Sequence, residues 1–513
     1  MVRWILRRGL WNVIALGKFT LARPRDIPLP PTRRHVITPK PMIEAIPEVP
    51  LRNVMVCARA DVPAEERVRR STAFYRVQVW LYSTVFAPMQ RGLPSIAADP
   101  QVALNRALTR RHRLLFRTPE MPAEFLGTPD LGSLAVRGPF ACYTTRVDDD
   151  DNTWEWDLLA LNDYEHHPGL TKVGARVLFN LDPLRRALRA RHIECALGTI
   201  KPADTRWDQA CKIVMCAAST HLSLVRHFNW VHLAGGAQLA ITTRNRLPPN
   251  HPLFRLLWPH IFATQHSNDL VIRGQMARGG DFESIFSLTF DGMCRLFDDS
   301  HLDYPHRVND PEADGDVRGV RGAGFDTPTQ DNLEAVFDVL HRYVRSYLQL
   351  YYPHNSVAGP GAVGADPAIL GWLKELNARV PNGVGVTAGD VTWDRLARLL
   401  ARLLYLVTVQ HEILGSFMWD YQLWTHRQPA RIYPDLRREP LDVYQRLVNA
   451  NFTLNVRRSA LMHDYSHLAL DPPAKEAMWE FQRELAALQS KLDTRPRPVW
   501  RLDPRDLEVN INA

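Results

Sequence analysis

Three histidines in apolar segments of the chain could hold a metal ion. His227 and His232 begin and end the stretch HFNWVH, and His411 lies in the apolar run 404–415. A buried neutral imidazole needs a partner for each ring nitrogen, and a metal ion is one such partner. On spacing alone, ordinary core histidines without a metal are the alternative interpretation for all three.

The five-residue spacing of His227 and His232 does not suit a regular α-helix. A step of five residues turns through roughly 140°, so the two side chains would diverge. On a local π-bulge, which has a wider turn, both imidazoles could point the same way, and such bulges are common at functional sites. A shared metal therefore requires a π-bulge in this helix.

Apolar residues at helical spacing predict a mainly α protein. The predicted helices cover residues 65–90, 102–117, 207–239, 252–272, 331–352, 368–377, 393–424, 441–450 and 473–492. A few strands or irregular segments are predicted at 126–180, where alternation, Gly and Pro occur. A Gly- and Asp-rich loop is predicted at 297–328. Its glycines do not indicate a nucleotide site, because no strand precedes the loop and no helix directly follows it.

The N-terminal region differs in composition from the rest. Residues 1–22 form a basic amphipathic element, which predicts possible peripheral membrane contact. Residues 23–63 are rich in proline and predict an extended arm that does not fold alone. We therefore expect an arm at 1–63 and a body at 64–513, in a cytoplasmic protein, with a peripheral position at a membrane surface as the alternative. Secretion is the less favoured alternative, because the segment has a poor cleavage site.

Charge and cysteine content exclude several classes of function. The chain has 513 residues, 63 Lys+Arg and 55 Asp+Glu, with a net charge of +8 and no long basic run. Nucleic-acid binding is therefore not indicated, and no partner protein is inferred. The six cysteines include no CxxC pair, which argues against a zinc site or a disulfide framework. No apolar run reaches 18 residues, which argues against an integral membrane protein.

The histidine pair belongs to a longer motif that resembles the central signature of lipoxygenases. In that family an H-x4-H pair precedes an R-x-L-x3-HP-x3-LL-x-PH segment, and residues 244–260 here are RNRLPPNHPLFRLLWPH. Asn245 stands where the family has arginine, with Arg244 beside it. The resemblance covers about residues 150–513 and extends to the final segment LDPRDLEVNINA.

The resemblance implies a single large helical catalytic domain with π-bulged metal-binding helices, without the N-terminal β-sandwich lipid-binding domain, as in minimal bacterial members. It implies one non-haem iron per chain, Fe(II)/Fe(III), with manganese as the alternative metal. The implied ligands are His227, His232, His411 and the terminal carboxylate of Ala513. The implied reaction begins when ferric hydroxide takes a hydrogen atom from a polyunsaturated fatty acid; O2 then traps the radical, which gives a hydroperoxide. No catalytic residue is implied beyond the metal centre.

Four positions depart from the family pattern. Gly415 stands where the family has a fourth ligating side chain, so water would fill that place or the site would lack one ligand. Ser223 and Met418 replace two glutamines of plant members that form an amide relay between metal and substrate. Val271 occupies the oxygen-steering position, where the family has Ala or Gly. These departures leave two alternatives: an oxygenase of this fold with a non-fatty-acid substrate, or a catalytically degenerate lipid-binding protein.

Overall fold

The computed structural model describes residues 27–66, 121–147, 152–356, 359, 361–422, 424, 426–434, 459–494 and 502–511. The helices predicted at 102–117 and 441–450, nearly all of the one predicted at 65–90, and Ala513 lie outside these ranges. Within them the protein is mainly α, as predicted, with two small sheets. None of the described helices is long and apolar enough to cross a bilayer.

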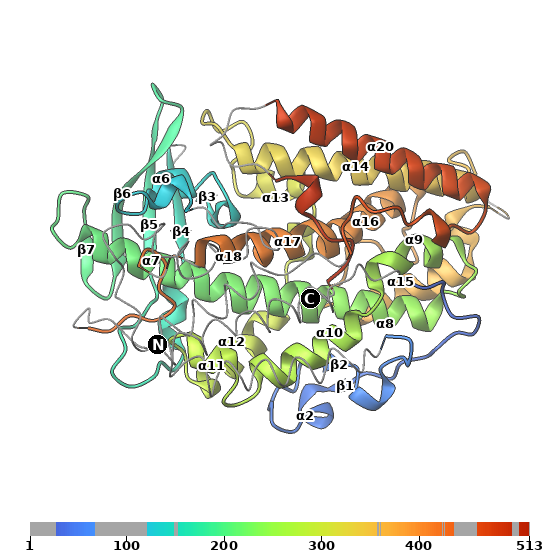
Figure 1. Cartoon of the computed structure of the whole chain (residues 1–513), viewed down its shortest axis with the longest axis horizontal. Helices are drawn as coiled ribbons and strands as arrows, with labels where there is room; N and C mark the ends of the chain where they lie inside the picture. Colours follow the sequence, from blue (N-terminus) through green and yellow to red (C-terminus); the bar gives the residue numbers. More distant parts are fainter. Residues whose placement is uncertain are drawn as a thin grey trace, which may run out of the picture.

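A long helix of mixed type runs through the middle of the helical body (Figure 1). It begins as α7 (Trp207–His221), continues as the π-helix η7 (Leu222–Gly236) and ends as α8 (Ala237–Arg246). Most of its side chains are buried on every face, as expected for a helix that is apolar all round. The predicted π geometry is confirmed, and it spans fifteen residues instead of a single bulge.

A second mixed helix packs against η7. It consists of α16 (Trp393–Tyr405), the π-helix η11 (Leu406–Gln410), α17 (His411–Leu414) and α18 (Ser416–Gln422). The sequence predicts one helix over 393–424, but the structure interrupts it at Gly415, with φ −104° and ψ −86°. Glycine is a weak helix former, so a break at this position is physically reasonable.

The predicted helix at 252–272 is wrong as a single element. The structure has α9 (Pro252–Ile261) and α10 (Thr264–Val271), followed by the π-helix η8 (Ile272–Met276). The break lies at the buried residue Ala263, which has a left-handed backbone with φ 63°. Alanine adopts this conformation only at a cost of roughly 1–2 kcal/mol, and no sequence pattern announces it.

The remaining helices pack around the two mixed helices. They are α2 (Met42–Ala45), α6 (Leu131–Leu134), α11 (Asp281–Ile285), α12 (Phe290–Leu302), α13 (Pro311–Val317), α14 (Pro328–Tyr351), α15 (Pro367–Arg379) and α20 (Pro472–Asp493). Short 3-10 turns are η1 (Arg59–Asp61), η4 (Ala123–Phe125), η5 (Pro139–Tyr143), η6 (Leu159–Asp163), η9 (His306–Asn309), η10 (Val363–Ala365), η12 (Ser466–Leu468) and η13 (Pro504–Asp506). The loop predicted at 297–328 is wrong in two places. Residues 297–302 belong to α12, and residues 311–317 form α13.

A five-stranded antiparallel sheet lies at one end of the molecule (Figure 1). Its strands, in spatial order, are β3 (Thr145–Arg146), β4 (Thr153–Asp157), β5 (Arg176–Asp182), β6 (Ala187–Cys195) and β7 (Gly198–Ile200). The predicted strand region ends at residue 180, so β6 and β7 were missed. The many charged residues of β6 conceal the alternation of a strand there.

The arm residues 27–66 lie against the helical body (blue in Figure 1). Strands β1 (Lys40–Pro41) and β2 (Met55–Val56) pair with each other. The Asn245 side chain accepts from the backbone N–H of Ile37 at 2.7 Å and donates to the carbonyl of the same residue at 2.9 Å. Arg244 forms a buried ion pair with Glu66. This segment therefore has polar contacts with α8, and it also accepts a hydrogen bond at the Pro28 carbonyl from the Trp258 indole of α9.

Candidate metal centre

The side chains of His227, His232 and His411 converge between η7 and α17. The Nε2 atoms of His227 and His232 lie 3.3 Å apart, and one nitrogen from each of the three rings lies within 4.8 Å of the others. Nitrogen ligands on one ion, each at about 2.1 Å from it, are separated by about 3.0–3.4 Å. Two Nε2 atoms at 3.3 Å therefore share either a proton or a cation.

The π-helix explains how two residues five apart reach one point. The backbone of η7 bonds residue i to residue i+5, so positions 227 and 232 come to lie above one another. His411 begins α17 directly after η11, a second π segment. Both helices that carry the histidines are therefore unwound locally where the side chains meet.

The electrostatic environment keeps the first two imidazoles neutral. Burial, followed by the neighbouring His232 and His411, holds the pKa of His227 well below its usual value. Burial, followed by His411, lowers the pKa of His232 to about 3. Metal ions bind the neutral form of histidine, so these shifts suit a ligand role near pH 7.

Two side chains orient the candidate ligands through their second nitrogens. The Oδ1 atom of Asn268 lies 2.9 Å from Nδ1 of His232, and the Asn268 amide donates to the His232 carbonyl at 3.1 Å. The carboxylate of buried Glu412 lies 2.8 Å from Nδ1 of His411. Both contacts place the ring proton on Nδ1 and leave Nε2 free as a metal ligand.

Asn268→Leu is expected to weaken metal binding about 10- to 100-fold, because His232 loses the acceptor that fixes its tautomer. Competition with a chromophoric chelator measures this affinity. Asn377→Leu is the matched control, since it removes a hydrogen-bonded amide from α15. Equal affinities in Asn268→Leu and the control would show that the amide does not act on the metal site.

Ser223 and Met418 meet in the structure. The Ser223 hydroxyl lies 3.5 Å from the Met418 sulfur. Ser223 precedes His227 by four residues on η7. The amide of Gln422 donates to Ser223 Oγ at 3.1 Å and to Ser219 Oγ at 2.8 Å. A side-chain amide therefore lies between α18 and η7, as in the plant members. It comes from Gln422, four residues after Met418, where the resemblance had placed the family's glutamine.

Gly415 lies directly against a candidate ligand. A β-carbon added at this glycine would stand 2.7 Å from Nε2 and 2.8 Å from Cε1 of His227. Real β-carbons essentially never come this close to another atom. The position thus faces the histidine cluster, but a side chain fits there only if His227 moves.

The C-terminal segment packs against α9 and against the end of η7, the helix that carries His227 and His232. His260 Nδ1 lies 2.8 Å from the carbonyl of Val509, and the Asn510 amide donates to the carbonyl of Pro259 at 2.9 Å. Ile511 is fully buried, and its Cδ1 lies 2.5 Å from where a β-carbon on Gly236 would be. Gly236 follows His232 by four residues. The ligand role of Ala513 remains a prediction, since that residue is outside the described ranges.

Gly236→Ala is expected to displace Ile511 and to destabilise the protein by about 1–3 kcal/mol through overpacking. Urea denaturation measures this loss. Gly371→Ala on α15 is the control, because nothing lies within 4 Å of its added β-carbon. That substitution is expected to stabilise the helix by up to about 1 kcal/mol. If both substitutions stabilise the protein, Ile511 does not pack on this helix in solution.

Val271 is the last residue of α10, half-buried against the core and three residues beyond Asn268. Its role in oxygen steering stays a prediction. Three residues at the site were not predicted from the sequence: Asn268, Glu412 and Gln422. A glutamate directly after His411 in an otherwise apolar run was the available signal for Glu412. The other two are brought in by tertiary packing.

Comparisons with known proteins point to one family. No family model matches the chain. It is 24% identical over 277 residues to the epidermal-type polyunsaturated fatty acid (12S)/(13S)-lipoxygenase of Mus musculus. This alignment covers 50% of the chain and 41% of that protein, so the chain spans less than half of the length of this curated relative.

Solved structures share the fold. A lipoxygenase in complex with arachidonate superposes with a TM-score of 0.74 at 17% identity, over 90% of this chain and 78% of that one. The manganese lipoxygenase of Gaeumannomyces graminis gives a TM-score of 0.72 at 14% identity, over 87% and 90% of the two chains. This chain is thus similar in sequence, over half of its length, to curated lipoxygenases, and it has a lipoxygenase-like fold.

Proposed function

We propose that this protein is a metal-dependent dioxygenase that inserts O2 into a polyunsaturated fatty acid to give a hydroperoxide. The observation that carries the proposal is the convergence of His227, His232 and His411 within 4.8 Å of one another. The curated relative is named as a polyunsaturated fatty acid lipoxygenase, and a structural neighbour was solved with arachidonate. Both names support a long unsaturated acyl chain as the substrate.

The donor set fits a redox-active divalent ion. Neutral imidazoles suit iron and manganese, and one structural neighbour is named as a manganese lipoxygenase. We favour iron, with manganese as the alternative, and Ala513 as the predicted carboxylate ligand. Either metal bound there would supply the one-electron chemistry that removal of a hydrogen atom between two double bonds requires.

The chain's own residues would hold and shield this centre. Asn268 and Glu412 orient two imidazoles, as described above. Phe228 packs against His232 with ring centroids 5.4 Å apart, and Phe282 and Phe297 lie 5.4 and 5.8 Å from Phe228. These rings form an apolar wall beside one candidate ligand, which would exclude water and offer contact to an acyl chain.

Metal analysis combined with oxygen uptake tests the proposal. The purified protein is expected to contain about one iron or manganese per chain. It is also expected to consume O2 with linoleate or arachidonate while a conjugated-diene absorbance appears. Metal without uptake on either fatty acid would favour an oxygenase with another substrate. A protein without metal would favour a lipid-binding role.

A further inference from the structure

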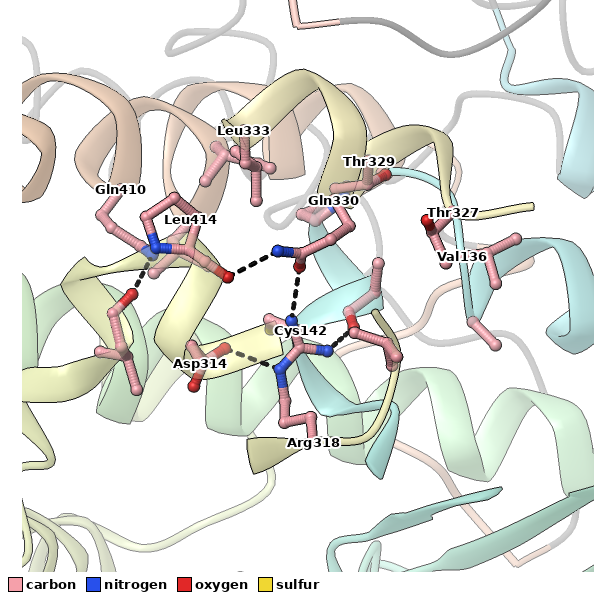
Figure 2. A pocket seen from close by; sticks show the side chains of 18 of the residues that line it. Val136, Cys142, Asp314, Arg318, Thr327, Thr329, Gln330, Leu333, Gln410 and Leu414 are labelled. Carbon is pink, nitrogen blue, oxygen red and sulfur yellow. Dashed lines mark hydrogen bonds and ion pairs between the residues drawn. The ribbon is translucent and has the colours of Figure 1, made fainter. Parts of the chain in front are cut away.

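A cavity lies beside the two helices that carry the histidines (Figure 2). Its lining residues come from η5, α13 and α14, from parts of η7, α16, η11 and α17, and from the loops between them, and none of the three histidines is among its described lining residues. Its lining includes Arg226, Gln410 and Leu414, which are sequence neighbours of His227, His411 and Gly415.

Arg226 is a cation without a partner in this cavity. Its guanidinium forms no hydrogen bond or ion pair with any residue that the structure describes, and its Nε atom is buried. The guanidinium carbon lies 4.9 Å from the ring centroid of Tyr143 and 5.3 Å from that of Trp230. Aromatic rings engage the faces of a guanidinium, so its N–H edges stay available for an acceptor.

The other charges in the lining balance each other. Arg318 donates to the Asp314 carboxylate at 2.6 Å and to Gln330 Oε1 at 3.0 Å, as the dashed lines in Figure 2 show. Burial raises the pKa of the Cys142 thiol and of the Tyr405 phenol, so both groups are neutral near pH 7. The cavity therefore carries one uncompensated positive charge, on Arg226.

Two hydroxyl groups add to the unmet hydrogen bonding. The Tyr405 hydroxyl and Thr329 Oγ1 are buried without a hydrogen-bond partner among the described residues, and both residues line the cavity. Ordered water could serve the hydroxyls, yet it would leave the charge of Arg226 unbalanced. A carboxylate would supply acceptor oxygens for the two hydroxyl groups. It would also supply the negative charge that balances Arg226.

We propose that this cavity is a binding site for a small aliphatic monocarboxylate, whose carboxylate pairs with Arg226 and whose chain lies along the apolar wall. The site is separate from the histidine cluster and does not depend on the proposed oxygenation. Because Arg226 and Gln410 directly precede two candidate metal ligands, occupation of the cavity would act on the helices that position them.

Calorimetric titration of the full-length protein with octanoate tests the proposal. The unmodified protein is expected to bind octanoate, and Arg226→Gln to bind it about 10- to 100-fold more weakly. Arg226→Lys keeps the charge and should retain part of the affinity. Octan-1-ol, which has no charge, should bind more weakly than octanoate. Arg342→Gln is the matched control, since Arg342 is an exposed arginine on α14 paired with Glu484.

Two further measurements separate this site from the metal centre and from folding defects. His232→Ala protein should still bind octanoate, whether or not the proposed oxygenase activity exists. The melting temperature of Arg226→Gln should equal or exceed that of the unmodified protein, because the substitution removes an unpaired cation. The proposal is overturned if octanoate does not bind, if Arg226→Gln binds it unchanged, or if only His232→Ala loses it.

Discussion

His232→Ala is expected to leave the protein without bound metal and without oxygen uptake. The substitution removes one of three converging nitrogens, and the remaining two donors do not enclose an ion. Loss of an outer partner of a ligand typically lowers metal affinity about 10- to 100-fold, and loss of the ligand itself should exceed that. Elemental analysis of the purified variant measures the metal, and an oxygen electrode with arachidonate measures the uptake.

His341→Ala is the control for the loss of a partly buried imidazole elsewhere. The His341 ring stacks on Phe337 with centroids 6.1 Å apart, and its Nε2 atom has no hydrogen-bond partner in the part of the chain that the structure describes. This variant should keep its metal. If His232→Ala also keeps a full complement of metal, His232 is not a ligand and the proposed centre is wrong.

The resemblance to lipoxygenases predicted that the three histidines lie together, and the spacing of the first two predicted the π-helix that carries them. Two imidazoles five residues apart can face one point only if the helix widens, so a π turn at 227–232 was a geometric necessity of the metal hypothesis. The length of η7 could not be predicted from the sequence. Its fifteen residues depend on how the helix packs against α12 and α17, and this is a tertiary property.

Elements with ordinary apolar periodicity were predicted well, and elements with local exceptions were not. The start of the helix at Trp207 was predicted to the residue, whereas its end was predicted at residue 239 and lies at Arg246. The break at Ala263 was missed, because a left-handed alanine is stabilised by its surroundings and not by its own preference. Helix α13 was missed despite a usable signal, since Asp310 caps it and Pro311 occupies its first position.

The sequence could not identify the site residues that only tertiary packing brings close to the histidines and to Ser223. Asn268 lies 36 positions from His232, and Gln422 lies 199 positions from Ser223, so no spacing rule connects them. Arg226 carries no distinguishing pattern either. Its lack of an ion pair becomes evident only from the fold, in which Asp314, the carboxylate among the described lining residues, pairs with Arg318.

Gly415→Ala is expected to reduce metal affinity at least about 10-fold and to destabilise the protein by about 1–3 kcal/mol. The added β-carbon would stand 2.7 Å from His227 Nε2, so the imidazole must leave the position from which it faces His232. The chelator competition described for Asn268 and urea denaturation measure the two effects. In an open helical position the same substitution stabilises by up to about 1 kcal/mol, as expected for Gly371→Ala, so the sign of the change is diagnostic.

Gly415→Asn distinguishes a missing ligand from a position without room. The family pattern predicts that asparagine at this position adds a fourth ligating side chain and strengthens metal retention. The contact between Gly415 and His227 predicts the opposite, because the longer side chain cannot reach the ion without displacing a histidine already there. Tighter metal binding in Gly415→Asn, with unchanged stability, would therefore show that α17 can shift to admit a side chain. Weaker binding would mean that glycine is required where the two metal-binding helices approach each other.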